Sequence, residues 1–294
     1  MSGRDLADRI VEQFSEGGER ADIWEAFDLF LPTGEFLNMG YSGPYQTHLL
    51  GSPQLRLVDR VLDELSTVEA DWSDGTLLDL GCGRGGAAER AATAYEADVV
   101  GIDLVGDNVL AGVERTAERC RSPAFIVGDA AHLPFDNDTF AACIAVDSIV
   151  YMPDKLDVYT EISRVIEPAG ACVVSDLLAD TGGDREHNEL QRFASAWDMP
   201  APWSLENYLP TIEASGLHVT NVIDLTPHSL GQFRRWTRLF LRVATSPLGS
   251  LLDRLLERRG LDPARIADQI RAAHDALPDL RHVLLTIRRC ETQR

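Results

Sequence analysis

The sequence contains almost no lysine and no long apolar run. Lys155 is the only lysine, so arginine supplies nearly all of the 27 basic side chains. The longest apolar run, about residues 140–146, is far shorter than the roughly 18 residues that a membrane-spanning helix needs. The first 19 residues are polar and lack the apolar core of a secretion signal. We therefore expect a cytoplasmic protein that does not span a membrane.

Cysteine is also scarce, and acidic residues outnumber basic residues. The 47 acidic residues give a net charge of −20, which repels polyphosphates. Neither nucleic acid nor an anionic membrane is therefore an expected partner, unless one face is locally basic. The five cysteines are odd in number and widely scattered, which predicts neither a disulfide framework nor a zinc site: Cys82, Cys120, Cys143, Cys172 and Cys290.

What the sequence does contain is an alternation of short apolar runs and helices that begins near residue 76. The 294 residues and 45% hydrophobic content are enough for one α/β domain with insertions. Strands that alternate with helices predict a mostly parallel sheet with helices on both faces. The predicted strands are Leu77–Leu80, Val99–Ile102, Phe125–Val127, Ala141–Val146, Ala171–Ser175, Val219–Ile223 and Val283–Ile287.

Several further segments are predicted as helices that surround this core. Two short helices, Asp5–Phe14 and Ala21–Phe30, precede a helix that Ser52 caps, with Pro53 in its first turn. Near the C-terminus, the apolar stripe of Leu230–Val243 indicates an amphipathic helix with solvated arginines. We predict one core domain with lids: a helical lid segment over 1–50, and a core over 51–294 with lid insertions at about 180–204 and 227–280.

The strongest local signal is a glycine-rich loop that follows the first strand. Gly81, Gly83 and Gly86 match the spacing of a dinucleotide-binding loop, so these glycines alone leave a nicotinamide-dependent oxidoreductase open. Asp79 argues against that alternative, because its charge would face a pyrophosphate. An acid at this position instead suits a ligand that carries an ammonium or sulfonium group.

Three further acids follow successive strands. Asp103 comes 22 positions after Gly81 and can accept hydrogen bonds from both hydroxyls of a ribose. Asp129 follows the third strand and can accept from the exocyclic amine of adenine, while Asp147 follows the fourth. Because the carboxyl ends of parallel strands meet at one edge of a sheet, we expect these acids to form one ligand site.

This ordered set of motifs resembles the class I S-adenosylmethionine-dependent methyltransferases. The resemblance covers about residues 51–225 and implies a Rossmann-like seven-stranded sheet whose last strand is antiparallel. It also implies S-adenosylmethionine as cofactor and S-adenosylhomocysteine as product. The residues that it assigns to the cofactor are Tyr41, Asp79, Gly81, Cys82, Gly83, Asp103, Leu104, Asn108, Asp129, Ala130, Asp147 and Ser148.

No motif identifies a catalytic base, so candidates are chosen by position. His228 follows the sixth strand and has the most suitable ordinary pKa. Tyr151 stands beyond the fourth strand, where related small-molecule methyltransferases often have histidine. Tyr41 lies in a segment that resembles the N-terminal lid of methyltransferases from natural-product and quinone pathways.

The resemblance implies methyl transfer to O, N or C of a small molecule, as in enzymes that modify secondary metabolites. The sequence leaves the acceptor atom open, and it also leaves open three alternatives to methyl transfer. One is a methyltransferase-like cyclase that uses S-adenosylmethionine as a structural cofactor. The others are the oxidoreductase and a non-catalytic cofactor-binding protein. The expected partner is a small-molecule substrate, and the sequence leaves open whether the chain forms a homo-oligomer.

Overall fold

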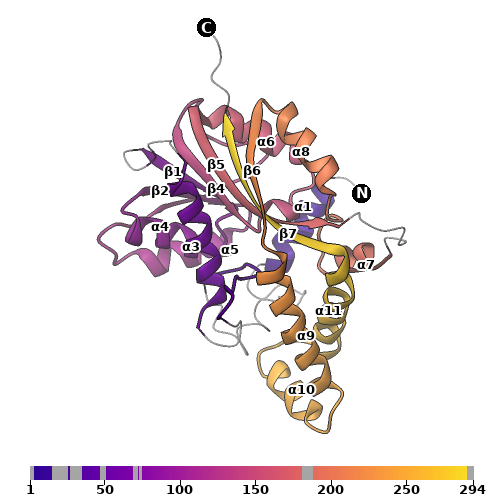
Figure 1. The fold of residues 1–294 in the computed structure, drawn as a ribbon. Helices are drawn as coiled ribbons and strands as arrows, with labels where there is room; N and C mark the ends of the chain where they lie inside the picture. Colours follow the sequence, from indigo (N-terminus) through magenta and orange to yellow (C-terminus); the bar gives the residue numbers. More distant parts are fainter. Residues whose placement is uncertain are drawn as a thin grey trace.

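The centre of the protein is a seven-stranded sheet with the strand order β3-β2-β1-β4-β5-β7-β6 (Figure 1). The computed structural model describes residues 3–14, 26, 35–46, 51–68, 72, 75–180 and 188–289. All paired neighbours from β3 to β5 run parallel, and β7 runs antiparallel to both β5 and β6. The predicted fold class is therefore confirmed. The strands are β1 (Thr76–Leu80), β2 (Asp98–Asp103), β3 (Ala124–Val127), β4 (Phe140–Val146), β5 (Ile166–Ala179), β6 (Leu217–Asp224) and β7 (Leu280–Arg289).

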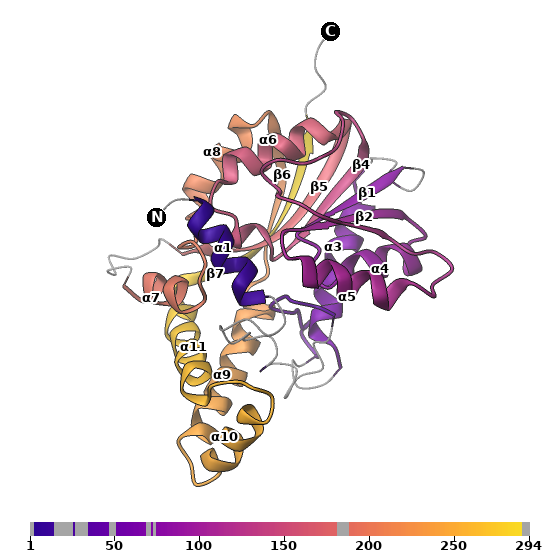
Figure 2. The same cartoon turned by 180° about the vertical axis from the view of Figure 1, so that it is seen from behind.

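The central strands β1, β4 and β5 are buried on both faces, and successive side chains of each strand point to opposite faces. In β1, Leu77 packs in one hydrophobic cluster with α3 and α4, whereas Leu78 packs in another with α6 and α8. The two groups of helices lie on opposite sides of the sheet (Figures 1 and 2). The helices of the two groups are α3 (Pro53–Ser66), α4 (Gly86–Ala94), α6 (Lys155–Val165) and α8 (Leu205–Ala214), and α5 (Gly106–Thr116) follows β2 along the chain.

The helix predicted to start at Ser52 is confirmed. The Ser52 hydroxyl oxygen accepts a hydrogen bond from the Leu55 N–H at 3.2 Å, and Pro53 occupies the first turn. The N-terminal helix α1 (Gly3–Phe14) matches the first predicted helix, while the second falls outside the described residues except for Ala26.

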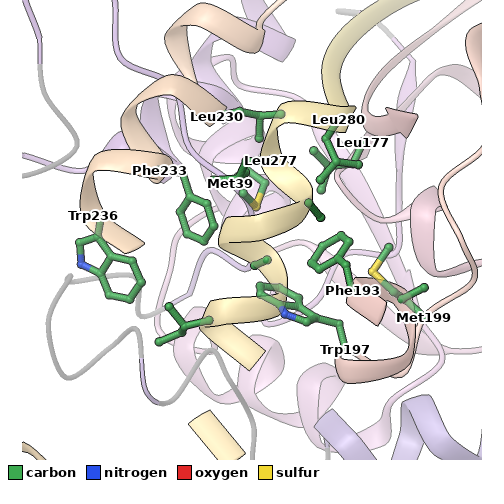
Figure 3. Packing of buried hydrophobic residues seen from close by; sticks show 14 of the residues in the cluster. Met39, Leu177, Phe193, Trp197, Met199, Leu230, Phe233, Trp236, Leu277 and Leu280 are labelled. Atoms are coloured by element: carbon green, nitrogen blue, oxygen red, sulfur yellow. The ribbon is translucent and has the colours of Figure 1, made fainter. Parts of the chain in front are cut away.

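A separate helical unit extends from one end of the sheet (Figure 2). Phe233, Trp236 and Phe240 stack along one face of α9 and are buried, whereas the neighbouring Arg234 and Arg238 are exposed, so the predicted amphipathic helix is confirmed. Side chains from α7, α9 and α11 meet in one hydrophobic cluster (Figure 3). The unit comprises α7 (Asn188–Ala196), α9 (Leu230–Ala244), α10 (Gly249–Glu257) and α11 (Pro263–Ala276), with the short helices η2 (Thr226–His228) and η3 (Leu277–Asp279) at its base.

No described helix combines the length and the apolar character that crossing a membrane requires.

Candidate functional site

The carboxyl ends of β1, β2 and β4 open onto a cavity of about 500 Å³, which we call the main cavity. Asp103, Asp129 and Asp147 all line it, as the sequence predicts for acids that follow neighbouring strands. The 3-10 helix η1 (Ile149–Tyr151) forms another part of its wall through Tyr151. A smaller cavity of about 30 Å³ shares Leu37 and Gly81 with the main cavity, and Asp79 lines it. The four predicted acids thus border two adjoining spaces.

The glycine loop lies between these two spaces and requires glycine for steric reasons. Gly81 has a φ of 68°, and an added Cβ would lie 2.5 Å from the Cβ of Ser148. The N–H groups of Gly81 and Cys82 both donate to the Ile102 carbonyl oxygen, at 2.8 and 3.0 Å. The loop is therefore held against β2, where its backbone can approach a ligand closely.

Asp103 is fixed at the wall of the main cavity by three donors. One carboxylate oxygen accepts from the Gly83 N–H at 2.8 Å; the other accepts from the Val105 N–H at 2.9 Å and from Asn108 Nδ2 at 3.4 Å. Burial raises the pKa of this carboxyl group, and the hydrogen bonds oppose that rise. The side chain is held rigidly and can still accept hydrogen bonds from a diol.

Asp79 differs from the other acids because it is buried and incompletely paired. Asp79 is only 1% exposed to solvent. Its Oδ2 atom has no hydrogen-bond partner among the described residues. Burial, with a smaller contribution from the charge of Asp103, raises the pKa of Asp79 to about 7, while a hydrogen bond from the Ala88 N–H opposes the rise. A buried carboxylate oxygen without a partner is costly, so this atom is suited to receive a cationic ligand group.

Asp147 belongs to a buried polar network that joins three parts of the chain. Its Oδ1 accepts from the Ser175 hydroxyl at 2.6 Å and lies 2.9 Å from His282 Nε2, while its Oδ2 accepts from the Met39 N–H at 2.8 Å. Burial alone would raise the pKa of Asp147, but the charge of His282 and these hydrogen bonds lower it below its ordinary value. Asp147 is therefore a buried carboxylate kept in its charged form.

A third cavity, of about 10 Å³, also borders Asp147, and we call it the apolar cavity. Asp147 and Tyr151 line both the main and the apolar cavity. The remaining lining side chains are hydrophobic and come from the N-terminal segment, η1, β5 and the helical unit: Met39, Val150, Leu177, Phe193, Trp197 and Met199. A polar boundary thus separates a large ligand space from a small hydrophobic one.

Most residues that the sequence assigned to a cofactor meet at these cavities. Asp79 and Cys82 line the small one beside the glycine loop. Nine others line the main cavity: Gly81, Gly83, Asp103, Leu104, Asn108, Asp129, Ala130, Asp147 and Ser148. Tyr41 and His228 instead lie against each other, with ring centroids 5.5 Å apart, and neither lines the main, the small or the apolar cavity. Their catalytic roles stay predictions.

Several residues at the site were not found by sequence reasoning. Ile10 and Phe14 of α1 line the main cavity, and Phe14 packs edge-on against Tyr151 at 5.6 Å between ring centroids. The amphipathic pattern of α1 indicates a buried face but not what it covers. His282 was also missed, and its only signal is an imidazole beside the apolar run Val283–Leu285.

Comparisons with known proteins agree with this geometry. Residues 77–170 match the family model described as "Methyltransferase domain". The chain is 27% identical to 27-O-demethylrifamycin SV methyltransferase of Amycolatopsis mediterranei, over 91% of this chain and 97% of that protein. The chain belongs to the class I S-adenosylmethionine-dependent methyltransferases. This methyltransferase acts on small molecules and uses S-adenosylmethionine as its cofactor.

Solved structures share the fold of this methyltransferase along almost the whole chain. A putative sarcosine dimethylglycine methyltransferase from Galdieria sulphuraria has a TM-score of 0.74 at 17% identity, covering 92% of this chain and 98% of that one. The [4+2]-cyclase SpnF has a TM-score of 0.67 at 22% identity, covering 92% and 96%. The fold alone therefore does not separate methyl transfer from cyclisation.

The described residues of the methyltransferase fit its cofactor. The unpartnered Oδ2 of Asp79 matches the need of an ammonium group, and a Cβ at Gly81 would crowd the loop that borders the main cavity. We infer that Asp79 and the glycine loop hold the methionine part. We further infer that Asp103 holds the ribose and that Asp129 holds the adenine edge.

Replacing Asp103 with alanine tests the ribose assignment. We expect cofactor affinity to fall by about 1–3 kcal/mol, because charge-assisted hydrogen bonds to the ribose are lost. The exposed Asp98 on the same strand supplies a control, Asp98→Ala, which should bind normally. Isothermal titration calorimetry with S-adenosylmethionine measures both variants, and an unchanged affinity in Asp103→Ala would refute the assignment.

Replacing His228 with alanine tests the base predicted from sequence. In the structure its Nδ1 lies 3.2 Å from the Ser42 carbonyl oxygen. If His228 takes the acceptor's proton, turnover should fall about 10²-fold or more with cofactor affinity intact. Full turnover by His228→Ala would remove this residue from the mechanism.

Proposed function

We propose that this methyltransferase methylates a hydroxyl group on an apolar small molecule of secondary metabolism. The observation that carries the proposal is the shared boundary of the main and apolar cavities, where Asp147 and Tyr151 face both spaces. The hydrophobic lining beyond them favours an uncharged acceptor body. A relative named for an O-demethylated small molecule supports oxygen as the acceptor atom.

The small size of the apolar cavity is compatible with this role, because part of its lining can rearrange. Met39 and Met199 are unbranched and adopt many shapes, so they can make room for an acceptor. Phe193 and Trp197 supply the flat walls and pack together at 5.2 Å between ring centroids (Figure 3). We propose that the acceptor enters beneath α7, with its hydroxyl directed toward Asp147.

The proposed mechanism assigns alignment and proton removal to the boundary residues. S-adenosylmethionine supplies an electrophilic methyl group when it is bound. Tyr151 and Asp147 orient the acceptor hydroxyl toward the main cavity, and the hydrophobic lining excludes water. The bound cofactor would supply the methyl group and keep the electrons of the carbon–sulfur bond on its sulfur, and the Asp147 carboxylate would take up the hydroxyl proton of the acceptor. The products are a methyl ether and S-adenosylhomocysteine.

A turnover assay tests this proposal. The purified protein is incubated with S-adenosylmethionine and a panel of apolar alcohols and phenols, matched with amines and carboxylates of the same skeleton. Mass spectrometry should detect O-methylated product and S-adenosylhomocysteine in equal amounts from the hydroxyl compounds. Methylation confined to amines or charged compounds would contradict the acceptor class. An isomerised product without S-adenosylhomocysteine would favour the cyclase alternative.

A further inference from the structure

We propose that His282 is a positioning residue that connects the start of the lid helix α9 to the carboxylate of Asp147. This inference rests on the proposed function, because it concerns the group that faces the acceptor. His282 lies on β7 and is fully buried, between strands whose side chains are mainly apolar. Its two ring nitrogens contact two different parts of the chain, so one side chain joins the lid to the reaction boundary.

The first contact of His282 is with the reaction boundary. Its Nε2 lies 2.9 Å from Asp147 Oδ1, and both side chains are almost completely excluded from solvent. Asp147 itself has a φ of 53°, a left-handed backbone conformation that is strained for a residue other than glycine. The hydrogen bonds of Asp147 therefore hold a strained residue in place, and His282 supplies one of them.

The second contact of His282 is with the lid. Its Nδ1 lies 2.7 Å from the hydroxyl of Ser229, which immediately precedes α9 and also donates to the Leu225 carbonyl oxygen at 3.1 Å. The backbone of His282 adds to this attachment, because its N–H donates to Thr226 Oγ1 at 3.0 Å and its carbonyl oxygen accepts from the Leu225 N–H at 2.8 Å. The segment that begins the lid is thus attached to β7 at one position.

Electrostatics distinguish His282 from a residue that only fills space. The charged and titratable groups that face Asp147 are His282 from β7, Asp176 from β5 and Tyr151 from η1. His282 lowers the pKa of Asp147, whereas burial raises it. The negative charge of Asp147 in turn contributes to raising the pKa of Asp176, whose largest cause is burial. Without His282, the pKa of Asp147 should rise, and the carboxylate should bind a proton at higher pH.

Two amide substitutions separate the two contacts. The side-chain amide of His282→Asn can replace Nδ1 and so keep the contact with Ser229, whereas that of His282→Gln can replace Nε2 and keep the contact with Asp147. The exposed His218 on the neighbouring strand β6 provides the control His218→Asn. Turnover against pH, calorimetric cofactor affinity and the unfolding temperature are measured for all three variants. Cleavage of the ligand-free protein by trypsin at the arginines of α9 and α10 gives a readout that needs no turnover.

We expect different results from the two variants. His282→Asn should lower kcat about tenfold or more and move the acidic limb of its pH profile upward, with cofactor affinity within about threefold of the wild type. His282→Gln should retain more of kcat than His282→Asn but speed tryptic cleavage of the lid at least about threefold, because the bond to Ser229 is lost. The control should leave every readout unchanged.

The inference fails if both variants lose activity only in proportion to their unfolding temperature, with unchanged pH profiles, or if both keep full activity. If His282→Asn does not fold, the variants His282→Gln and Ser229→Ala decide the lid contact by the trypsin readout. The proposed function is judged separately by the wild-type assay. If the wild type forms no methyl ether, the function fails, whereas the cleavage result still tests the attachment of the lid.

Discussion

Replacing Asp79 with asparagine is expected to weaken S-adenosylmethionine binding about 30-fold or more and, at the same time, to stabilise the ligand-free protein. The affinity should fall because a charge-assisted hydrogen bond to the ammonium group is worth roughly 2 kcal/mol. Stability should rise because the wild type buries an acid with an unpartnered oxygen and a pKa of about 7. Calorimetry and thermal unfolding of the ligand-free protein measure the two effects.

The pH dependence of Asp79 follows from the direction of its pKa change. The pKa is raised from 3.8 to about 7 on folding, so between these values the folded state binds a proton that the unfolded state has released. The free energy of unfolding should therefore decrease as pH rises from about 4 to 7, by a few kcal/mol at most at about 1.4 kcal/mol per pKa unit. In Asp79→Asn this decrease should disappear, so its stability relative to the wild type should grow from about pH 4 and reach its full extent above about pH 7.

Cofactor binding should show the opposite dependence on pH. The ammonium group favours ionised Asp79, so wild-type affinity should increase as pH rises from about 6 to 8, and Asp79→Asn should lack this increase. The exposed Asp253 on α10 provides the control Asp253→Asn, which should bind normally and gain no stability. Equal cofactor affinity in Asp79→Asn and the wild type at pH 8 would show that Asp79 does not contact the ammonium group.

Replacing Asp147 with asparagine is the second substitution with a large expected effect. It should lower kcat about 10²-fold or more. The amide has nearly the shape of the carboxylate but cannot take up the acceptor proton. Cofactor affinity should stay within about threefold, because the ribose and adenine contacts are assigned to Asp103 and Asp129. Single-turnover measurement with an accepted hydroxyl compound separates the chemical step from binding.

A matched variant controls for disruption of the Asp147 network. Ser175→Ala removes one hydrogen bond to the same carboxylate but keeps its charge. It should lower kcat much less than Asp147→Asn does. If Asp147→Asn keeps wild-type kcat, the proton must leave by another route and Asp147 only orients the acceptor.

The sheet and the main cavity could be predicted because their signals are local. An apolar run at Leu77 predicts the strand, and alternating glycines from Gly81 predict the loop. Asp103 and Asp129 follow predicted strands that end at one edge of the sheet. Once strands are parallel, the residues after them must lie together. The rule needs no knowledge of side-chain packing, which explains its success here.

The reaction boundary could not be predicted, because it depends on contacts between distant segments. His282 reaches Asp147 only because β7 inserts between β5 and β6, with His282 opposite Leu177. Met39 donates to Asp147 across 108 positions of sequence. Strand order and register are set by the whole core, so a histidine at the start of an apolar run could not be assigned a partner.

Asp176 is a second buried residue whose partner could not be predicted from the sequence. It lies on β5, is fully buried and accepts a hydrogen bond from the Tyr208 hydroxyl, and burial raises its pKa to about 6. Nothing in its local sequence indicates that Tyr208, 32 positions away, packs over it from α8. Asp79 also lies within a strand, but the glycine loop that follows it marked it as a site residue, and Asp176 has no such motif beside it.

A crystal structure of the protein with S-adenosylhomocysteine tests the central claim most directly. The account predicts the ammonium group beside Asp79, the ribose hydroxyls on Asp103 and the sulfur facing Asp147 and Tyr151. It would be contradicted by a ligand that binds with its adenine at Asp79, or by a cavity that excludes this ligand yet admits a nicotinamide nucleotide.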